Sequence, residues 1–368
     1  MNELQEARNE ISAVDEEMAR LFERRMRAAA IIADYKRRNG LSVKDPAREQ
    51  ELIKRNRSYI ESEEIESYYV QFLRRTIDLS CEYQARLMEG MRVTYCGVEG
   101  AFAHIAAQKM FPGAQLFPFS DFADAYKAVE RGEYDCVVLP LENSAAGEVG
   151  TVMDLIFSGE LFVNQVVDLS IVHNLLGVPG AALDGVKTVI SHQQALDQCG
   201  EYIRSHGFET RAFSNTALAA KFVKDSGDAS VAAIASDETS DIFGLNILDR
   251  GINDSKINTT RFAALSRAQN RPAGKSSREE ENFILVFTVK NEAGALAQTL
   301  NIIGSHGYNM RNLRSRPMKD LQWNYFFYIE AEGNVNTENG RDMLRELSAV
   351  CAKLKLVGTF YSNLKIGE

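Results

Sequence analysis

The sequence predicts a multidomain protein with an all-α segment, an α/β segment and a small α+β module of order βαββαβ. The chain has 368 residues, enough for two or three domains at about 150 residues each. Apolar residues recur at helical spacing up to residue 90 and form strand-like runs after Met91. Residues 268–281 are polar, contain Pro and Gly and lack periodicity, which indicates a linker before the last module.

The composition excludes several classes of protein. Hydrophobic residues at 45% and charged residues at 25% are typical of a chain that folds throughout. A net charge of −9 gives no basic field for a polyanion, so we expect small-molecule ligands and no nucleic acid. The N-terminus lacks the apolar core of a signal peptide, so we expect a cytoplasmic protein without membrane contact. Five scattered cysteines without a CxxC pair, and histidines without an HxxxH motif, predict neither a metal nor a cofactor.

The first segment, residues 1–90, is predicted to be all-α. Leu4, Ala7, Ile11 and later apolar residues recur at spacings of three and four, and no Pro or Gly precedes Gly40. This predicts one helix from residue 4 to about 38, roughly 50 Å long. Residues 46–57 and 63–88 are predicted to be two further helices. Because so long an apolar stripe needs partner helices and a partner chain, a dimerisation module is the simplest interpretation of this pattern.

Cations on the long helix suggest a second role. Arg25 and Lys36 are eleven residues apart, so they point the same way and lie roughly 16 Å apart along the axis, within reach of one small dianion. Arg8 is roughly 25 Å from Arg25 and turned by about a quarter of a circle, so it could reach that ligand only from a second chain. Ordinary surface cations remain the alternative.

The first segment resembles the all-helical chorismate mutases in the strings ARNEISAVDEEMARLFERR and DPAREQEL, and in the single residues Lys36, Ser80 and Gln84 outside them. The resemblance implies residues that hold the two carboxylates of chorismate: Arg8 of a partner subunit, Arg25, Arg48 and Ser80. It implies others that face the ether oxygen or the ring hydroxyl: Lys36, Gln84, Asp45 and Glu49. A Claisen rearrangement needs a compact substrate conformer and donors at the ether oxygen, which cations and an amide supply.

The second segment, residues 91–267, has the pattern of an α/β domain. Candidate strands are 93–98, 136–141, 186–191 and 231–235. The polar strings GVEGAF, PLENSAAGEVG and SHQQALDQCG follow strand-like runs and lead toward helices, and NTTRF stands near the end. Ligands of open α/β sheets bind beyond the carboxyl ends of strands, where helix N-termini favour carboxylates. For any single Ser, Thr or Asn at such a turn, helix capping is the alternative.

Taken together, these strings resemble prephenate dehydratase over residues 92 to about 267. The resemblance implies a two-lobed fold like that of periplasmic binding proteins, with the active cleft between the lobes. Thr260 would be essential, either as a hydrogen-bond donor to the departing hydroxide or as the last link from a stronger acid such as Glu142. Arg261 would bind a carboxylate. Further residues implied to line the cleft are Asn143, Ser144, Ser191, Gln194, Asn215, Thr216 and Phe262.

His192 and Gln193 are neighbours at the turn that follows the predicted strand 186–191. Gln193 stands where members of the family commonly carry proline, so we expect a less rigid turn with no reacting group lost. His192 is either a further acid or, as is common at a helix start, a structural residue.

The third segment, residues 282–368, has the order βαββαβ. We predict strands at 283–289, around 312, at 325–329 and near 357, and helices at 294–305 and 341–355. The module resembles an ACT domain of the phenylalanine-sensing kind, whose loops usually read GALV and ESRP. The matching positions, implied to bind the effector, are Gly294, Ala295, Leu296, Ala297, Arg314, Ser315, Arg316 and Pro317. Arg314 reverses the charge of a glutamate and Ala297 replaces a valine, so a module without its ligand remains an alternative.

Together the resemblances imply a bifunctional enzyme of phenylalanine biosynthesis, chorismate mutase and prephenate dehydratase, inhibited by L-phenylalanine. It would form a homodimer or a higher homo-oligomer. One alternative is a dehydratase whose mutase segment serves mainly dimerisation and whose last module no longer senses phenylalanine. A ligand-binding protein and an amino-acid-responsive regulator are further alternatives, which turnover of chorismate would exclude.

Overall fold

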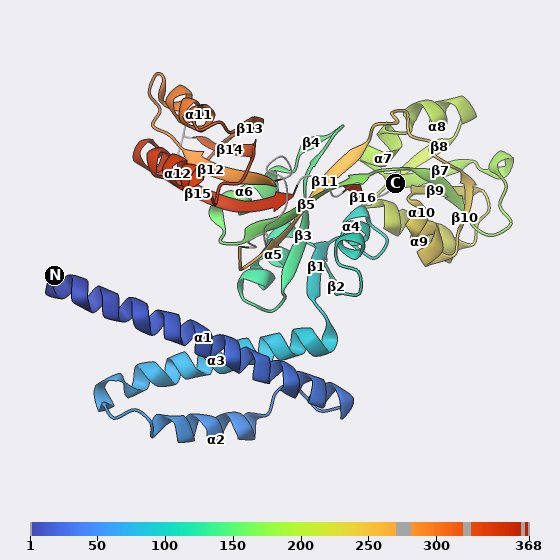
Figure 1. Cartoon of the computed structure of the whole chain (residues 1–368). Coiled ribbons are helices and arrows are strands. Elements are labelled where there is room, and N and C mark those ends of the chain that lie inside the picture. The colour runs from blue at the N-terminus through green and yellow to red at the C-terminus, as the bar shows by residue number, and fades with distance from the viewer. Residues whose placement is uncertain (1, 270–280, 319–324, 362–364, 367–368) are drawn as a thin grey trace. The chain divides into compact units, whose positions relative to one another are not determined.

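The computed structural model describes residues 2–269, 281–318, 325–361 and 365–366 (Figure 1). The chain divides into two compact units, Met1–Met91 and Arg92–Glu368. Most of the predicted linker, residues 268–281, lies outside the described residues.

The first unit is all-α, as predicted. Its helices are α1 (Glu3–Arg38), α2 (Pro46–Arg57) and α3 (Glu63–Glu89). Asn2 caps α1, and Asp45 caps α2, which begins with a proline. Both α1 and α2 contact α3. Only Ala29 and Ala33 of the 36-residue α1 are buried, so nearly all of its apolar stripe is open in a single chain.

The second unit contains two sheets. The larger sheet has the order β13-β14-β12-β15-β5-β11-β3-β1-β2, and the smaller has the order β10-β6-β9-β7-β8. The strands up to the crossing between sheets are β1 (Arg92–Cys96), β2 (Gln115–Phe119), β3 (Cys136–Asn143), β4 (Gly147–Glu148) and β5 (Phe162–Ser170). Those of the smaller sheet are β6 (Asn174–Gly177), β7 (Thr188–His192), β8 (Glu209–Phe213), β9 (Val231–Ala235) and β10 (Asn246–Asp249).

Helices separate most of these strands. They are α4 (Phe102–Met110), α5 (Phe122–Glu130), α6 (Gly150–Ser158), α7 (Gln193–Asp197), α8 (Gly200–His206), α9 (Thr216–Ser226) and α10 (Asp237–Phe243). The chain leaves the larger sheet after β5, builds the smaller sheet, and returns in β11 (Thr259–Ser266). Residues 171–173 and 250–258 therefore make the two crossings, and the predicted two-lobed α/β fold is confirmed.

The C-terminal module has the predicted βαββαβ order. It consists of β12 (Glu281–Thr288), α11 (Ala295–Ser305), β13 (Met310–Pro317), β14 (Tyr325–Glu332), α12 (Glu338–Val350) and β15 (Lys353–Tyr361), and the two-residue β16 (Lys365–Ile366) follows. The predicted helix 341–355 is wrong at its end, because Lys353 already begins β15.

The module is joined to the rest of the second unit by strand pairing. Gly358 of β15 pairs with Val163 of β5, so both parts share one sheet. One hydrophobic cluster also contains residues of both, among them Leu139 and Phe360. The C-terminal module and the strands β1, β2, β3, β5 and β11 therefore share one sheet and one hydrophobic core.

Candidate active sites

A cavity of about 720 Å³ lies between the two lobes of the second unit. It is bounded by the carboxyl ends of several strands and by the first turns of α4 and α9. Free N–H groups at such helix starts favour anions. Of the residues predicted to line the cleft, the structure brings six to this cavity: Asn143, Gln194, Asn215, Thr216, Thr260 and Phe262. Among the described residues that line it there is no Asp, Glu, Lys or Arg.

An irregularity in the β3–β11 pairing selects which residues face the cavity. Thr260 pairs with Asn143, whereas Phe262 pairs with Pro140, so β3 carries one extra residue between them. Side chains alternate along a regular strand, and Pro140 and Asn143 would then point to opposite faces. The extra residue acts as a β-bulge, so Pro140 and Asn143 both line the cavity, each beside its partner on β11, Phe262 or Thr260.

Thr260 is held by the side chain of Asn143. Asn143 Nδ2 donates to Thr260 Oγ1 at 2.8 Å and to Asn258 Oδ1 at 3.0 Å. The Thr260 hydroxyl therefore accepts a hydrogen bond from the strand beside it. No acceptor for its own proton lies among the described residues, so that proton is available to a molecule in the cavity.

The sequence interpretation missed three residues of this wall. Gln198 and His173 line the cavity, and buried Asn258 connects them to Asn143. Gln198 Oε1 lies 2.9 Å from both Asn258 Nδ2 and His173 Nε2. Gln198 Nε2 and His173 Nδ1 are buried and have no hydrogen-bond partner among the described residues. Gln198 lies inside the quoted string SHQQALDQCG and Asn258 in NTTRF, so for these two residues the strings were the available signal, whereas His173 lies in none of the quoted strings.

His192 has a structural role at the cavity edge. Its Nδ1 accepts a hydrogen bond from the backbone N–H of Gln194 at 3.3 Å and caps α7. The side chain of Gln193 lies outside the cavity lining and donates to Asp197 at 2.8 Å.

Four other predicted cleft residues do not line the cavity. Ser191 is fully buried and donates to the backbone oxygen of Ile234, and Ser144 accepts from the backbone N–H of Thr259. Glu142 and Arg261 pair with each other across β3 and β11 and lie on the face opposite to Asn143 and Thr260. The expected roles of Glu142 as the acid and of Arg261 as a carboxylate ligand are therefore not supported by their positions.

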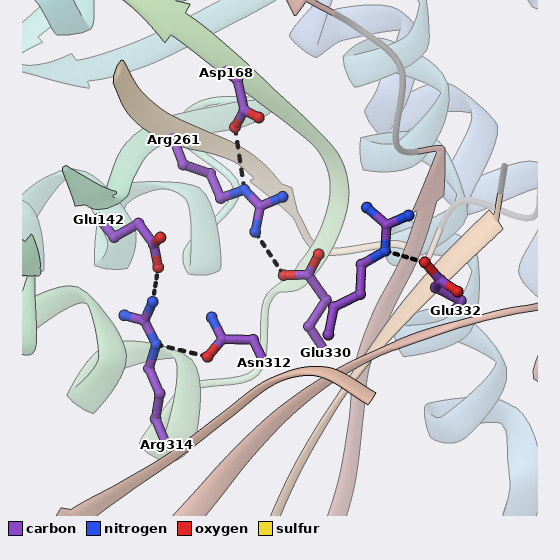
Figure 2. A network of polar contacts seen from close by, with 8 residues as sticks. Glu142, Asp168, Arg261, Asn312, Arg314, Glu330 and Glu332 are labelled. Carbon is purple, nitrogen blue, oxygen red and sulfur yellow. Dashed lines mark hydrogen bonds and ion pairs between the residues drawn. The ribbon is translucent and has the colours of Figure 1, made fainter. Parts of the chain in front are cut away.

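Arg261 instead lies between two carboxylates, as Figure 2 shows. Its Nη1 is 2.9 Å from Glu330 Oε2 of β14, and its Nε is 3.2 Å from Asp168 Oδ1 of β5. The Glu330 side chain is only 2% exposed. Burial raises the pKa of the Glu330 carboxyl, and the charge of Arg261 opposes that shift. Arg261 of β11 thus compensates the buried charge of Glu330, which belongs to β14 of the C-terminal module.

Two arginines of the predicted effector segment also reach out of the module. Arg314 forms an ion pair with Glu142 and a hydrogen bond with Asn312 (Figure 2). Arg316 forms an ion pair with Asp154 of α6 at 2.5 Å and with Glu148 of β4 at 3.4 Å. The residues between and after them, Ser315 and Pro317, are exposed on the other face of β13.

The other predicted effector stretch lies at the start of α11. Gly294 is its N-cap and has a left-handed backbone with φ 86°, which glycine adopts without strain. Ala295 and Leu296 are half-buried and Ala297 is exposed.

In the first unit, one face of α3 gathers several predicted residues. Arg25 donates to Ser80 Oγ and, at 3.1 Å, to the backbone oxygen of Thr76. Burial lowers the pKa of Arg25. Gln84 follows one turn after Ser80, is buried, and has no partner for its Oε1 among the described residues.

The remaining predicted mutase residues lie at the edges of this cluster or away from it. Cys81 Sγ lies 3.8 Å from Glu49 Oε1, and burial, followed by the Glu49 charge, raises the pKa of that thiol. Lys36 Nζ donates to the backbone oxygen of Val43 at 2.6 Å. Asp45 caps α2, Arg48 forms an ion pair with Glu51, and Arg8 is exposed on α1.

No group of three or more His, Cys, Asp or Glu side chains with metal-binding geometry occurs in the ranges that the structure describes. Within the same ranges, no helix is long and apolar enough to cross a membrane.

The chain is similar to known proteins in both of its units. The family model for chorismate mutase type II matches residues 7–85, and that for prephenate dehydratase matches residues 93–270. The bifunctional chorismate mutase/prephenate dehydratase of Neisseria gonorrhoeae is 30% identical over 96% of this chain and 95% of its own. That of Aquifex aeolicus is 29% identical over 98% of each chain.

Among solved structures, prephenate dehydratase from Arthrobacter aurescens in complex with L-Phe is 27% identical, with a TM-score of 0.68. The match covers 75% of this chain and 92% of the Arthrobacter aurescens protein. These matches confirm the two predicted enzyme activities and their place in phenylalanine biosynthesis. By its sequence over nearly the whole length, and by the fold of its second unit, the chain belongs to the family of bifunctional chorismate mutase/prephenate dehydratases.

Proposed function

We propose that the second unit converts prephenate to phenylpyruvate in the cavity between the lobes, with Thr260 as hydrogen-bond donor to the departing hydroxide. The observation that supports this is the direction of the Asn143–Thr260 hydrogen bond, which leaves the threonine proton free for the cavity. Loss of carbon dioxide and hydroxide makes the ring aromatic, so the enzyme has mainly to stabilise the charge that develops on the leaving oxygen. The starts of α4 and α9 would hold the substrate carboxylates in place of Arg261.

The test uses the bifunctional chain as its own control. Thr260→Ala removes the donor and should abolish phenylpyruvate formation, whereas Thr260→Ser keeps a hydroxyl and should retain part of it. Chorismate consumption by the first unit should stay unchanged in both variants, which shows that the chain is correctly quantified and that its first unit is folded. Dehydratase activity in Thr260→Ala would contradict the proposal.

We further propose that the mutase site is shared between two chains. α1 and α3 expose large apolar side chains, a surface that needs a partner. Those on α1 include Leu4, Ile11, Val14, Met18, Leu21 and Phe22. Arg25, Ser80 and Gln84 already lie together, and a second copy would supply Arg8.

Mixed dimers test this sharing. Arg8→Ala and Arg25→Ala should each inactivate the mutase alone. Co-expressed, they should recover about one quarter of the wild-type activity, because half of the dimers are mixed and each has one intact site. No recovery in mixed dimers, or a monomeric active protein, would contradict a shared site.

We also propose that L-phenylalanine inhibits the dehydratase through the C-terminal module. Arg314 and Arg316 connect β13 to β3, β4 and α6, and Glu142 is the sequence neighbour of the cavity residue Asn143. A ligand that binds the module differently in two states of the cavity would shift their populations. The complex of the Arthrobacter aurescens relative with L-Phe supports this choice of ligand.

The experiment compares binding and inhibition. L-phenylalanine should bind, measured by calorimetry, and should lower dehydratase but not mutase turnover. Arg314→Gln should weaken inhibition while binding persists. Arg311→Gln is the matched control, because Arg311 pairs with Glu332 inside the module. Absence of phenylalanine binding would overturn the proposal.

A further inference from the structure

A series of hydrogen bonds with a defined direction runs along the cavity wall to Thr260. It passes from His173 through Gln198, Asn258 and Asn143. Its members come from different parts of the unit. Asn143 and Thr260 belong to the larger sheet, Gln198 follows α7 beside the smaller sheet, and His173 and Asn258 lie on the two crossings.

The direction is set at Asn143 by the backbone. Its Oδ1 accepts from the backbone N–H groups of Ala145 and Ala146, both at 3.0 Å. The amide nitrogen must therefore face Thr260 and Asn258. Asn258 consequently presents its oxygen to Asn143 and its nitrogen to Gln198, at 2.9 Å. Because each amide has one accepting and one donating end, this orientation passes along the chain.

The same logic assigns the histidine tautomer. Gln198 presents Oε1 to both Asn258 and His173, and an amide oxygen can only accept. The nitrogen of His173 at 2.9 Å, Nε2, must therefore carry a proton. The ring is 2% exposed, and burial lowers its pKa, which favours the neutral form with Nδ1 unprotonated.

His173 is also fixed in place. Its backbone N–H donates to Asn253 Oδ1 at 2.7 Å, and its carbonyl oxygen accepts from the N–H of Ile252 at 2.9 Å. The ring lies edge-on to Phe102 at a centroid distance of 5.7 Å. A donor held this rigidly fixes the side chain that it contacts, and Gln198 receives donors from both crossings at one oxygen.

We propose that His173 is a positioning residue for the dehydratase reaction. Its Nε2–H holds the Gln198 amide in the orientation that the hydrogen bonds from Asn258 through Asn143 to Thr260 require. Without it, Gln198 can turn its amide and Asn258 loses its acceptor, so the Asn258 side chain that lies against Asn143 Nδ2, beside Thr260, is no longer fixed. The same bond keeps Gln198 Nε2 free as a donor in the cavity wall. The inference rests on the proposed role of Thr260.

The experiment measures dehydratase kcat and KM together with mutase turnover in the full-length protein. His173→Phe keeps a ring against Phe102 and removes the donor. We expect kcat to fall about 10- to 100-fold with KM changed less than about threefold, because positioning acts mainly in the transition state. His173→Gln offers an N–H of similar reach and should restore kcat to within about fivefold of wild type. Exposed His206, which contacts Phe208, is the matched control, and His206→Phe should change neither parameter.

The alternative outcomes separate the explanations. Unchanged kcat in His173→Phe, or His173→Gln as inactive as His173→Phe, would overturn the positioning role. A raised KM with unchanged kcat would do the same and would indicate direct substrate contact. Full activity in Thr260→Ala would instead refute the proposed function itself. An inactive Thr260→Ala beside a fully active His173→Phe would refute only the inference.

Discussion

Replacing Arg261 with leucine distinguishes a stabilising residue from a substrate ligand. In the structure the Arg261 side chain is 24% exposed and its partner Glu330 is 2% exposed. Arg261→Leu leaves that carboxylate buried without its contacting cation, which typically costs about 3 to 5 kcal/mol. For a unit of this size, each kcal/mol lost from the free energy of unfolding lowers the melting temperature by about 2 to 4 °C. The thermal midpoint of the second unit should therefore fall by about 6 to 20 °C.

The loss should also depend on pH. Burial raises the pKa of Glu330 in the folded protein, and removal of Arg261 raises it further. A carboxyl whose folded pKa exceeds its unfolded value destabilises the fold as pH rises above the ordinary 4.5. Arg261→Leu should therefore be less destabilised at pH 5 than at pH 8.

The assay is thermal unfolding followed by calorimetry, with dehydratase KM measured below the transition. The double variant Arg261→Leu/Glu330→Leu removes both charges and should recover most of the stability, since apolar replacement of a buried pair is often neutral. A single variant with an unchanged midpoint and a strongly raised KM would refute this reasoning. It would restore Arg261 as a carboxylate ligand.

Two further predictions concern the sheet junction and acid stability. A Cβ on Gly358 would overlap the carbonyl oxygen of Val163 and lie 2.8 Å from its carbonyl carbon, so Gly358→Ala should destabilise the second unit by about 1 to 3 kcal/mol. The control Gly304→Ala, in α11 with open space around it, should stabilise it by about 0.5 to 1 kcal/mol, and equal midpoints for the two variants would contradict the clash. Burial lowers the pKa of His104 and His173 below the ordinary 6.5, so the unfolded chain takes up protons first and stability should fall as pH drops from about 7 to 5. Unfolding midpoints across this range should show a smaller loss in His173→Gln, and an equal loss would disprove the assignment.

Local pattern was sufficient for the elements with strong periodicity. α1 follows from apolar residues at helical spacing, a capping Asn2, and the absence of Pro and Gly before residue 40. The βαββαβ order of the last module follows from alternating apolar runs and one amphipathic stretch after another. Strands such as β2 and β8 escaped prediction because β2 contains a proline and β8 is mostly exposed, so neither has a distinct apolar alternation.

The sequence by itself also indicated that GVEGAF and PLENSAAGEVG meet, because β1 and β3 are parallel neighbours whose carboxyl ends lie at one edge of a sheet. NTTRF reaches that edge at the start of the antiparallel strand β11, and SHQQALDQCG comes from the smaller sheet, so their meeting at the cavity depended on the tertiary fold. The sequence did not determine which residues of each string face inward. Side-chain direction on a strand follows from register, and the extra residue of β3 opposite β11 reverses it between Pro140 and Asn143. Glu142 and Arg261, which the resemblance placed at the cleft, therefore lie outside the cavity lining. The pairing of Glu142 with Arg314, 172 positions away, and the path from His173 to Thr260 depend on contacts that only the tertiary fold creates.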